Sequence, residues 1–555
     1  MTSAGSPRTI RLPDEVHQLL AGILSFFRKE KEDPGEIWMV GGAIRDLLLG
    51  RDAVYDLDLA VSRSPIGPAQ RVARGQSAGF VVLDQEREVA RVVKSLHGRV
   101  VTVDFARYRA PTLDEDLRDR DFTINAIAIK LAWPLLERDL PIYDPLGGVE
   151  DLQAKVLRPC SDHLFREDPL RILRAYRFAA TLGFTFHPDL ETLIVRDVHL
   201  LKAVSAERIR DEFFKVLSAS DSARWVRSMG QTGVLREILP EFEATRGITQ
   251  NDWHHLDVFD HTLLALEKFE GLLGQSAFSR SWGKVQAFLA EPISGIRTYL
   301  ELFKFGCLLH DIGKPACRKV VSPSGGKGKS AEASKPSPHA GSLPESAAID
   351  RPVTEAASEG SGPVAPEDPE GRVVFHGHEM VGARMVEEIG KQWKLSVNEV
   401  DFLKKVVKNH MRPGVILQEL DQKPEACRNQ ERDRLLFRFF SETGRDGVGI
   451  ALMSLADRLS ARGAQQEEDL ARFAAGIAGF IDSFYQQTEN ARLPALLTGN
   501  DLITQFRLSP GPLFKEILGA LKEAQALGEV QTREEAVDFV SRFLAGRKGP
   551  PPAAR

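Results

Sequence analysis

Hydrophobic and polar positions change their spacing partway along the chain, which separates a mixed α/β part from a helical part. Residues 10–30 repeat with the period of an amphipathic helix, and residues 37–42 then have the pattern of a short buried strand that ends in a glycine turn. Residues 55–61 and 99–107 alternate as half-buried strands do. Helical periods predominate from about residue 162 to the end. The pattern predicts an α/β head followed by all-helical regions.

One segment of the chain interrupts this helical pattern. Residues 321–371 contain no aromatic side chain and consist mostly of Ser, Pro, Gly, Ala and Glu. Such a segment cannot bury enough apolar surface to order itself. We therefore expect a disordered insertion within a helical domain.

The length and the cysteines limit the class of protein. A chain of 555 residues is longer than one hydrophobic core usually serves, so we expect several domains. The four cysteines lie far apart, which argues against a disulfide scaffold and for a reducing compartment. No stretch has the length and apolarity of a membrane span, and the first residues lack the apolar core of a signal peptide. We expect a cytoplasmic protein with no membrane contact, and no obligate protein partner is inferred.

Three aspartates and a glycine turn form the first candidate site. Asp56 and Asp58 are two apart on a strand, so their side chains project from one face, and Asp104 lies on a later alternating strand. Carboxylates in this arrangement suit Mg²⁺ and the two-metal chemistry of nucleotidyl transfer. The turn before the next helix brings bare backbone amides and a cation toward a triphosphate. Its candidate residues are Gly41, Gly42 and Arg45.

Two motifs carry a resemblance to a known family. GGAIRDLLLGRDAVYDLDLAV resembles the signature of the class II tRNA nucleotidyltransferases and bacterial poly(A) polymerases, and LRDRDFTINAIAI resembles their second motif, RRDFTINA. The resemblance implies a polymerase β-like nucleotidyltransferase head in which Arg120, Asp121 and Asn125 bind the incoming nucleotide. One position departs from the motif, because Asp119 stands where the family has its first arginine.

A third motif suggests how the nucleotide is chosen. REDPLRILRAYRF resembles the family's EDxxR motif, in which Asp168 and Arg171 are three apart and would be neighbours on one helical face. The resemblance implies that this pair matches the edge of a cytosine or adenine, with Arg174 at the triphosphate. The alternative is a salt bridge on a solvated helix. We interpret Glu207 and Arg208, further along, as structural support.

Histidines and aspartates on predicted helices form a second candidate site, with His261, His310, Asp311 and Asp457 among them. Their order resembles that of the HD phosphohydrolase domain, and imidazoles with carboxylates suit Mg²⁺, Mn²⁺ or Ni²⁺. Lys314 follows in the same motif as a candidate phosphate contact, and His376 resembles an extra ligand. The candidate metal ligands are His261, His310, Asp311, His378, His410 and Asp457.

The resemblance covers nearly the whole chain outside the insertion and implies four regions. They are a catalytic head (1–155), a base-reading and RNA-binding neck (156–245), an HD domain (246–470) and a C-terminal helical region (471–555). Since the net charge is −5, RNA contacts would come from a local basic surface, of which residues 158–177 are the best candidate.

The resemblance implies template-independent addition of C, A or both to the 3′ end of tRNA from CTP and ATP, together with hydrolysis at the HD site. Residues 108–116 are short where many CCA-adding relatives carry a longer flexible loop. A CC-only enzyme therefore stays open, as do an A-only enzyme and a poly(A) polymerase. A further alternative is an RNA-binding HD phosphohydrolase with an inactive transferase domain.

Overall fold

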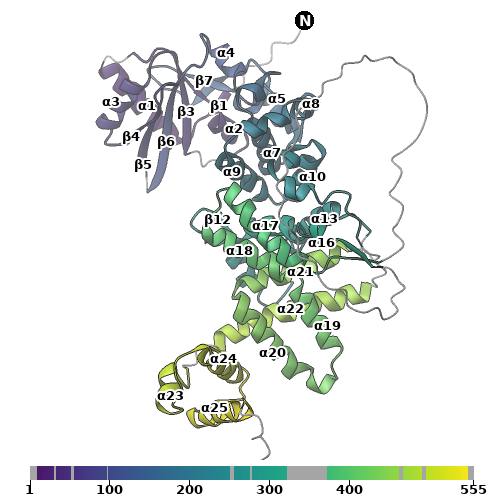
Figure 1. Cartoon of the computed structure of the whole chain (residues 1–555). Helices are drawn as coiled ribbons and strands as arrows, with labels where there is room; N and C mark the ends of the chain where they lie inside the picture. Colours follow the sequence, from purple (N-terminus) through teal and green to yellow (C-terminus); the bar gives the residue numbers. More distant parts are fainter. Residues whose placement is uncertain are drawn as a thin grey trace, which may run out of the picture.

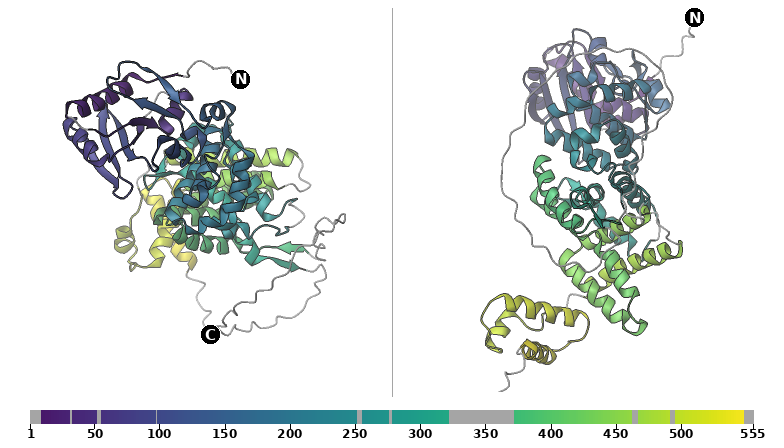
Figure 2. Two further views of the ribbon diagram at one scale, coloured as in Figure 1. Left: turned by 90° about the horizontal axis from the view of Figure 1, so that it is seen from above. Right: turned by 45° about the vertical axis from the view of Figure 1, so that its right-hand side comes forward.

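The computed structural model describes most of the chain, which forms an elongated molecule with the head at one end and the C-terminal helices at the other (Figure 1). Figure 2 shows the same order of parts from two further directions. The described residues are 9–30, 33–51, 55–96, 98–250, 255–275, 278–321, 372–461, 467–490 and 495–547.

The head contains an eight-stranded sheet in the order β1-β8-β7-β2-β3-β6-β5-β4. Neighbouring strands are antiparallel except β3 and β6, which run parallel and pair Asp58 with Asp104. The strands are β1 (Thr9–Arg11), β2 (Ile37–Val40), β3 (Asp56–Val61), β4 (Gly79–Asp84), β5 (Val89–Leu96), β6 (Arg99–Arg107), β7 (Ala128–Leu131) and β8 (Asp139–Tyr143).

One face of this sheet is buried against helices. The Leu57 and Leu59 side chains of β3 and Phe105 of β6 join the head core, where Phe105 meets the ring of Phe27 edge-on. The intervening polar residues of β3 and β6 therefore lie on the opposite face. The head helices are α1 (Asp14–Lys29), α2 (Gly42–Leu48), α3 (Ile66–Gly75) and α4 (Leu113–Arg118), with a 3₁₀ turn η1 (Thr123–Asn125).

The helices that follow the head share one continuous hydrophobic core, which runs from Phe122 to Phe484. Before residue 250 they are α5 (Gly148–Ala154), α6 (Leu164–Glu167), α7 (Arg171–Leu182), α8 (Pro188–Asp197), η2 (Val198–Ala203), α9 (Ala206–Leu217), α10 (Ser222–Gln231), α11 (Val234–Ile238) and α12 (Pro240–Glu243). Beyond it they are α13 (Val258–Leu273), α14 (Trp282–Ala290), α15 (Tyr299–Leu309), α16 (Lys314–Cys317), α17 (His378–Gln392), α18 (Val397–Asn409), α19 (Arg412–Asp421), α20 (Glu425–Thr443), α21 (Asp446–Ser460) and α22 (Glu467–Asn490).

The last helices form a small unit with a hydrophobic core of its own. They are α23 (Gly499–Thr504), α24 (Pro512–Ala526) and α25 (Arg533–Arg547). Short strand pairs lie among the helices. They are β9 (Val156–Leu157) with β10 (Thr185–Phe186), β11 (Pro292–Ile293) with β12 (Arg297–Thr298), and β13 (Lys319–Val321) with β14 (Arg372–Val374). No helix in the described part of the chain is long and apolar enough to cross a membrane.

The predicted insertion and the predicted helix through Asp168 can be compared with the described residues. The predicted insertion lies outside the described residues apart from Val321, and the antiparallel pairing of β13 with β14 brings its two flanks together. The predicted helix through Asp168 and Arg171 was wrong at its start, because α7 begins only at Arg171. Asp168 has extended backbone angles, and its carboxylate accepts a hydrogen bond from the Leu170 amide, so it lies in a turn before the helix rather than belonging to it.

Candidate functional site

The three aspartates lie together on the solvent side of β3 and β6. Asp56 and Asp58 alternate with buried leucines, and Asp104 is the register partner of Asp58 on the parallel neighbour. Thr102 donates a hydrogen bond to Asp56 at 2.5 Å. Asp104 is held by Arg91 of β5 through two hydrogen bonds of 2.7 and 2.8 Å. Asp56 and Asp58 are therefore the carboxylates that a metal ion can reach without breaking an ion pair.

Asp58 faces the glycine turn and a cluster of charges. A Cβ atom on Gly41 would come within 3.0 Å of Asp58 Oδ2, and Gly41 has φ +82°, so both space and backbone favour glycine there. Although solvent reaches the Asp58 carboxylate, desolvation by the protein around it raises its pKa. Arg120 opposes this rise, whereas the negative charges of Asp104 and Asp56 add to it. An excess of negative charge at one point of the sheet is what a bound cation would neutralise.

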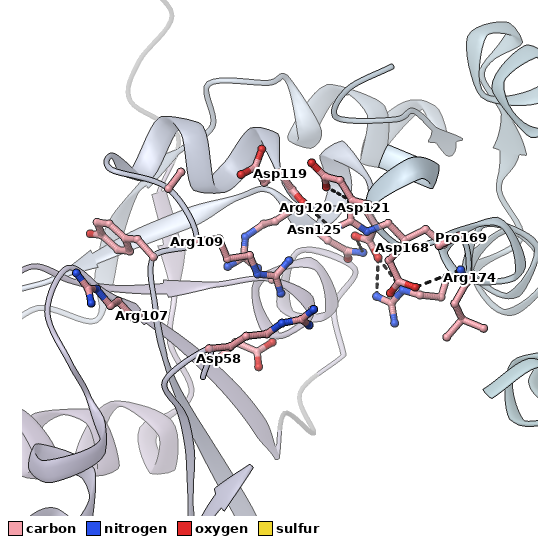
Figure 3. A pocket seen from close by; sticks show the side chains of 18 of the residues that line it. Asp58, Arg107, Arg109, Asp119, Arg120, Asp121, Asn125, Asp168, Pro169 and Arg174 are labelled. Atoms are coloured by element: carbon pink, nitrogen blue, oxygen red, sulfur yellow. Dashed lines mark hydrogen bonds and ion pairs between the residues drawn. The ribbon is translucent and has the colours of Figure 1, made fainter. Parts of the chain in front are cut away.

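Beside Asp58 opens a cavity of about 1340 Å³ between the head and the helices that follow it. Its wall is rich in arginines, and Figure 3 shows Arg109 and Arg120 beside one another near Asp58. Burial lowers the pKa of Arg109, and the nearby charge of Arg120 lowers it further. A concentration of desolvated positive charge favours an anionic ligand such as a triphosphate. The lining arginines are Arg45, Arg87, Arg107, Arg109, Arg120, Arg171, Arg174, Arg177 and Arg208.

A buried ion pair joins the second motif to helix α7. The Asp121 carboxylate accepts hydrogen bonds from the Arg174 guanidinium, the Asn125 amide and the Phe122 backbone. Burial alone would raise the pKa of Asp121, but Arg174 and these hydrogen bonds together lower it. Asn125 in turn accepts a 2.7 Å hydrogen bond from Arg45. Asp121 and Asn125 therefore line the cavity while holding two of its arginines in place.

The proposed base-reading pair does not form a salt bridge. Asp168 is bound by Arg208 of α9, with oxygen–nitrogen distances of 2.9 and 3.2 Å. Arg171 instead donates to Glu167 at 2.8 Å and to the backbone oxygens of Leu164 and Asp119. The alternative of a salt bridge between them is therefore wrong, whereas both residues line the same cavity.

Several cavity residues were not singled out from the sequence. Arg109 follows the β6 strand and was not named, Arg177 was placed only within the basic segment 158–177, and Arg208 was interpreted only as structural support. The three-residue spacing of Arg171, Arg174 and Arg177 could have identified Arg177, because such residues share one helical face. Nothing in the spacing indicates Arg109, which reaches the cavity through the connection from β6 to α4.

The second site is a buried cluster that gathers the six candidate ligands from five helical segments. His261 lies within α13, Asp457 lies within α21, and His378 begins α17. The expectation that His310 and Asp311 lie within a helix was wrong, because α15 ends at Leu309 and both residues follow it. His410 similarly follows α18. His376 is exposed and does not belong to the cluster.

The cluster has the donor set of a divalent metal site. His261, His310 and Asp311 form one group that could hold an ion, and Asp311, His378 and His410 form another. Within the described part of the chain, His310 Nε2 is buried and has no partner in hydrogen-bonding geometry. It lies 3.1 Å from Asp311 Oδ2, which also faces the Lys314 ammonium at 2.6 Å. Buried polar atoms usually find partners, so these residues fit a metal ion.

Comparisons with known proteins agree with both motifs in the first half of the chain. Residues 37–158 match the family model described as the poly A polymerase head domain, and residues 183–245 match that of the probable RNA and SrmB-binding site of polymerase A. The A-adding tRNA nucleotidyltransferase of Deinococcus radiodurans is 32% identical over 518 residues, which cover 92% of this chain and 96% of that protein.

The chain belongs to the class II tRNA nucleotidyltransferase and poly(A) polymerase family. Another full-length member, the CC-adding tRNA nucleotidyltransferase of Thermus thermophilus, is 29% identical over 523 residues, covering 93% of this chain and 95% of that one. The fold agrees with the solved structure of the Thermotoga maritima CCA-adding enzyme complexed with tRNA, with a TM-score of 0.57. The two chains are 19% identical, and the match covers 96% of this chain and 97% of that one. Membership makes this chain a nucleotidyltransferase and confirms the α/β head followed by helical regions.

Proposed function

We propose that this nucleotidyltransferase extends the 3′ end of tRNA without a template. The RNA 3′-oxygen forms a bond to the α-phosphorus of the incoming CTP or ATP, the bond to the β-phosphate breaks, and pyrophosphate leaves while the hydroxyl proton passes to water. The observation that supports this most is the placement of Asp58 beside the glycine turn at the edge of an arginine-lined cavity. A carboxylate pair and a cationic wall are what nucleotidyl transfer requires.

Asp56 and Asp58 are the residues proposed to hold Mg²⁺. Ions bound there supply charge neutralisation for the attacking and leaving oxygens. Asp104 shapes the site from the neighbouring strand and is restrained by Arg91. Arg109 and Arg120 would bind the triphosphate. Arg120 is close enough to Asp58 to lower the pKa of that carboxyl, and the neighbouring positive charges lower the pKa of Arg109, which an anionic ligand would offset.

Nucleotide choice is assigned to the neck side of the cavity. Asp168 offers acceptor oxygens and Arg171 offers donors, which together match the complementary edge of a cytosine or adenine. Arg208 holds the Asp168 carboxylate and belongs to the same unit. Arg174 is proposed to support the pocket through Asp121 and to contact the triphosphate from there.

The favoured product is the partial CC end. The connection from β6 to α4 contains only residues 108–112, and its conformation is fixed by the Thr112 capping box and by a hydrogen bond from the Arg109 amide to Asp116. A connection this short and tightly bonded leaves no length for the flexible loop with which relatives switch from C to A. The full-length similarity to an A-adding enzyme makes A addition the second candidate.

Three tRNA transcripts distinguish these outcomes: one that ends before CCA, one that ends after C and one that ends after CC. Incubation with CTP should extend the first by two residues and the second by one, and ATP should leave the third unchanged. Extension of the third by a single A would establish the second candidate. Long A tails on any transcript would indicate a poly(A) polymerase. An inactive transferase would extend none, although Asp56, Asp58 and Gly41 are all retained.

The histidine–aspartate cluster is proposed to hydrolyse phosphate esters of RNA ends. A divalent ion bound there supplies an activated water at neutral pH. Lys314, whose ammonium lies 2.6 Å from Asp311 Oδ2, is placed to contact a phosphate. The test is hydrolysis of 2′,3′-cyclic nucleotides and of RNA 3′-phosphates by metal-loaded protein, with Mg²⁺, Mn²⁺ or Ni²⁺ added in turn. Absence of hydrolysis with every ion would make the cluster structural.

The four-region division remains our proposal for the organisation of the chain. The separate core of the head supports the first boundary. The core of the C-terminal helices includes no residue before Leu496, whereas Phe480 and Phe484 of the proposed last region belong to the shared core, so the boundary at 471 lacks this support. The neck and the HD region share one core, so we propose that they act as a single rigid body that presents the cavity and the cluster on one RNA-binding protein.

A further inference from the structure

The Phe178 ring lies beside three of the arginines that line the cavity. The guanidinium carbon of Arg177 is 4.2 Å from the ring centroid, and those of Arg45 and Arg174 are 5.1 and 5.3 Å from it. Arg45 belongs to α2 of the head, whereas Arg174 and Arg177 belong to α7. Phe178 also lines the cavity and is only 6% exposed. One aromatic ring therefore contacts cations from the head and from the neck.

The three guanidiniums repel one another in a partly desolvated place. Burial lowers the pKa of Arg177 most, and the positive charges of Arg174 and Arg45 lower it further. Glu212, which accepts a hydrogen bond from Arg177 at 3.2 Å, opposes this effect. Like charges that are held near one another out of water tend to spread toward solvent. Other interactions must therefore keep these arginines together while no anion is bound.

Part of each guanidinium is held by a carboxylate. The pairs are Arg45 with Asp46, Arg174 with Asp121, and Arg177 with Glu212. A carboxylate occupies N–H groups and cancels charge, so it reduces what an arginine can offer to a ligand. An aromatic face attracts a guanidinium through its quadrupole and carries no net charge. Contact with Phe178 therefore stabilises the arginines while their N–H groups stay able to donate.

The ring is itself held in one orientation. Phe122, which follows Asp121 in the second motif, meets it edge-on, with a centroid separation of 5.8 Å and an interplanar angle of 82°. Both rings belong to the core that the neck shares with the HD region. Since side chains in a close-packed core have little freedom to change rotamer, Phe178 offers its surface to the arginines before a nucleotide arrives.

We propose that Phe178 is a positioning residue that gathers these three arginines for the triphosphate of the incoming nucleotide. In this role the ring acts through the arginines and not by touching the nucleotide. Without the ring the guanidiniums would spread apart, and the ligand would have to order them again at a cost in affinity. The inference rests on the proposed function for the identity of the ligand, whereas the gathering of cations for a polyphosphate is measurable without catalysis.

Fluorination of the ring tests the proposal, because each fluorine withdraws electron density from the aromatic face and hardly changes the size of the side chain. Phenylalanine analogues with one, two and three ring fluorines are incorporated at position 178 alone. Calorimetry in Mg²⁺-free buffer then gives the dissociation constant of inorganic tripolyphosphate. We expect this constant to rise with each fluorine, by about tenfold for the trifluoro protein. With Mg²⁺ and a tRNA acceptor, the KM for the added nucleotide should rise in parallel while kcat stays within about twofold.

Phe184 provides the matched control. Its side chain is 1% exposed in the same core, and within the described part of the chain no cationic side chain lies over its ring. The same fluorine series at Phe184 should leave the dissociation constant and the KM unchanged. Phe178→Leu removes the ring and keeps an apolar side chain, and it should raise both constants at least as far as three fluorines do.

Constants that do not change across the Phe178 series would overturn the proposal, as would a wild type that does not bind tripolyphosphate. Equal increases in the Phe178 and Phe184 series would also overturn it, because they would indicate an effect on core packing. A stepwise loss of tripolyphosphate affinity, confined to the Phe178 series, in a protein that adds no nucleotide would leave the role of the ring standing and reject the proposed function.

Discussion

The carboxylate of Asp168 is bound by the guanidinium of Arg208, 40 residues further along the chain, and not by that of Arg171. The proposed base-reading unit therefore joins the turn before α7, which holds Asp168, to α9, which holds Arg208. Because both residues line the cavity, a nucleotide that enters it meets Asp168 in an orientation set by Arg208. We therefore predict that Arg208 affects nucleotide choice.

Arg208→Ala should reduce the preference for the correct nucleotide over UTP and GTP by about tenfold, since a lost bidentate contact typically costs about 1–3 kcal/mol of discrimination. The measurement is kcat/KM for each nucleotide on a tRNA acceptor. Glu207→Ala is the matched control, because Glu207 is exposed on the same helix and is not among the cavity residues. Equal loss for all four nucleotides would indicate that Arg208 only stabilises the fold.

Asp56→Asn or Asp58→Asn should lower nucleotide incorporation at least a thousandfold with little change in thermal stability. The two carboxylates are solvent-facing and support no core packing, so their loss affects metal binding rather than folding. Asp139→Asn removes an exposed carboxylate at the other end of the same sheet and should leave incorporation unchanged. Incorporation near the wild-type level in either site variant would reject the assignment.

Gly41→Ala should reduce incorporation at least tenfold. The added methyl group would lie 3.0 Å from Asp58 Oδ2 and 3.5 Å from Arg120 Nη1, and the residue would keep a positive φ. Gly50→Ala separates these causes, because Gly50 has φ +73° but nothing within 4 Å of the added carbon. Gly41 has ψ −146°, a region essentially limited to glycine, so its alanine variant should lose about 1–3 kcal/mol of stability, and Gly50→Ala should lose about 1 kcal/mol. Only the first should lose activity, and equal activities would remove any role for the close approach.

How far the sequence predicts this molecule depends on how local each interaction is. Residues 99–107 were predicted as a strand with the bounds that β6 has, because alternation is visible within one segment. The helix start at Arg171 was missed, since the local hydrogen bond from the Leu170 amide to Asp168 competes with the helix and leaves no periodic signal. The hairpin of β4 and β5 was not predicted from the sequence, although β5 supplies the Arg91 that restrains Asp104.

At the second site, too, long-range packing could not be predicted from the sequence. The order of His261, Asp311 and Asp457 suggested a shared metal site, and the structure brings these groups together across 196 residues of chain. The division of the ligands between the two oxygens of Asp311 depends on how α15, α17 and α18 pack. Packing of that kind is a long-range property, so spacing along the chain could not distinguish His378, inside the cluster, from the exposed His376.

Acid should remove the stabilising effect of Asp121. Burial opposes its ionisation, but Arg174 and the Asn125 amide lower its pKa below the ordinary value, so the folded state favours the carboxylate. The stabilisation is therefore complete above the unfolded pKa, about 4, and is lost as the pH falls through the lower folded pKa. Asp121→Asn should cost about 2–3 kcal/mol near pH 7, and less as the pH approaches 3.5.

Melting temperatures of the wild type and of Asp121→Asn across this pH range provide the measurement. The gap between the two proteins should narrow on acidification. An Asp139→Asn control should show a small gap that hardly depends on pH, because Asp139 and its partner Arg11 are both largely exposed. A gap for Asp121→Asn that stays constant down to pH 3.5 would mean that the lost contribution is packing or hydrogen bonding and not charge.

The two chemical centres should operate independently. Changing His310→Gln and Asp311→Asn together should abolish hydrolysis of 2′,3′-cyclic nucleotides while nucleotide addition to tRNA stays within about threefold of wild type. Both residues are buried in the core that the neck shares with the HD region, so near-isosteric substitutions are preferable to alanine. The reciprocal variant, Asp58→Asn, should lose nucleotide addition and keep hydrolysis. If the His310→Gln/Asp311→Asn protein stays folded by circular dichroism yet loses nucleotide addition, then the shared core transmits metal binding to the cavity, and the two sites form one coupled unit.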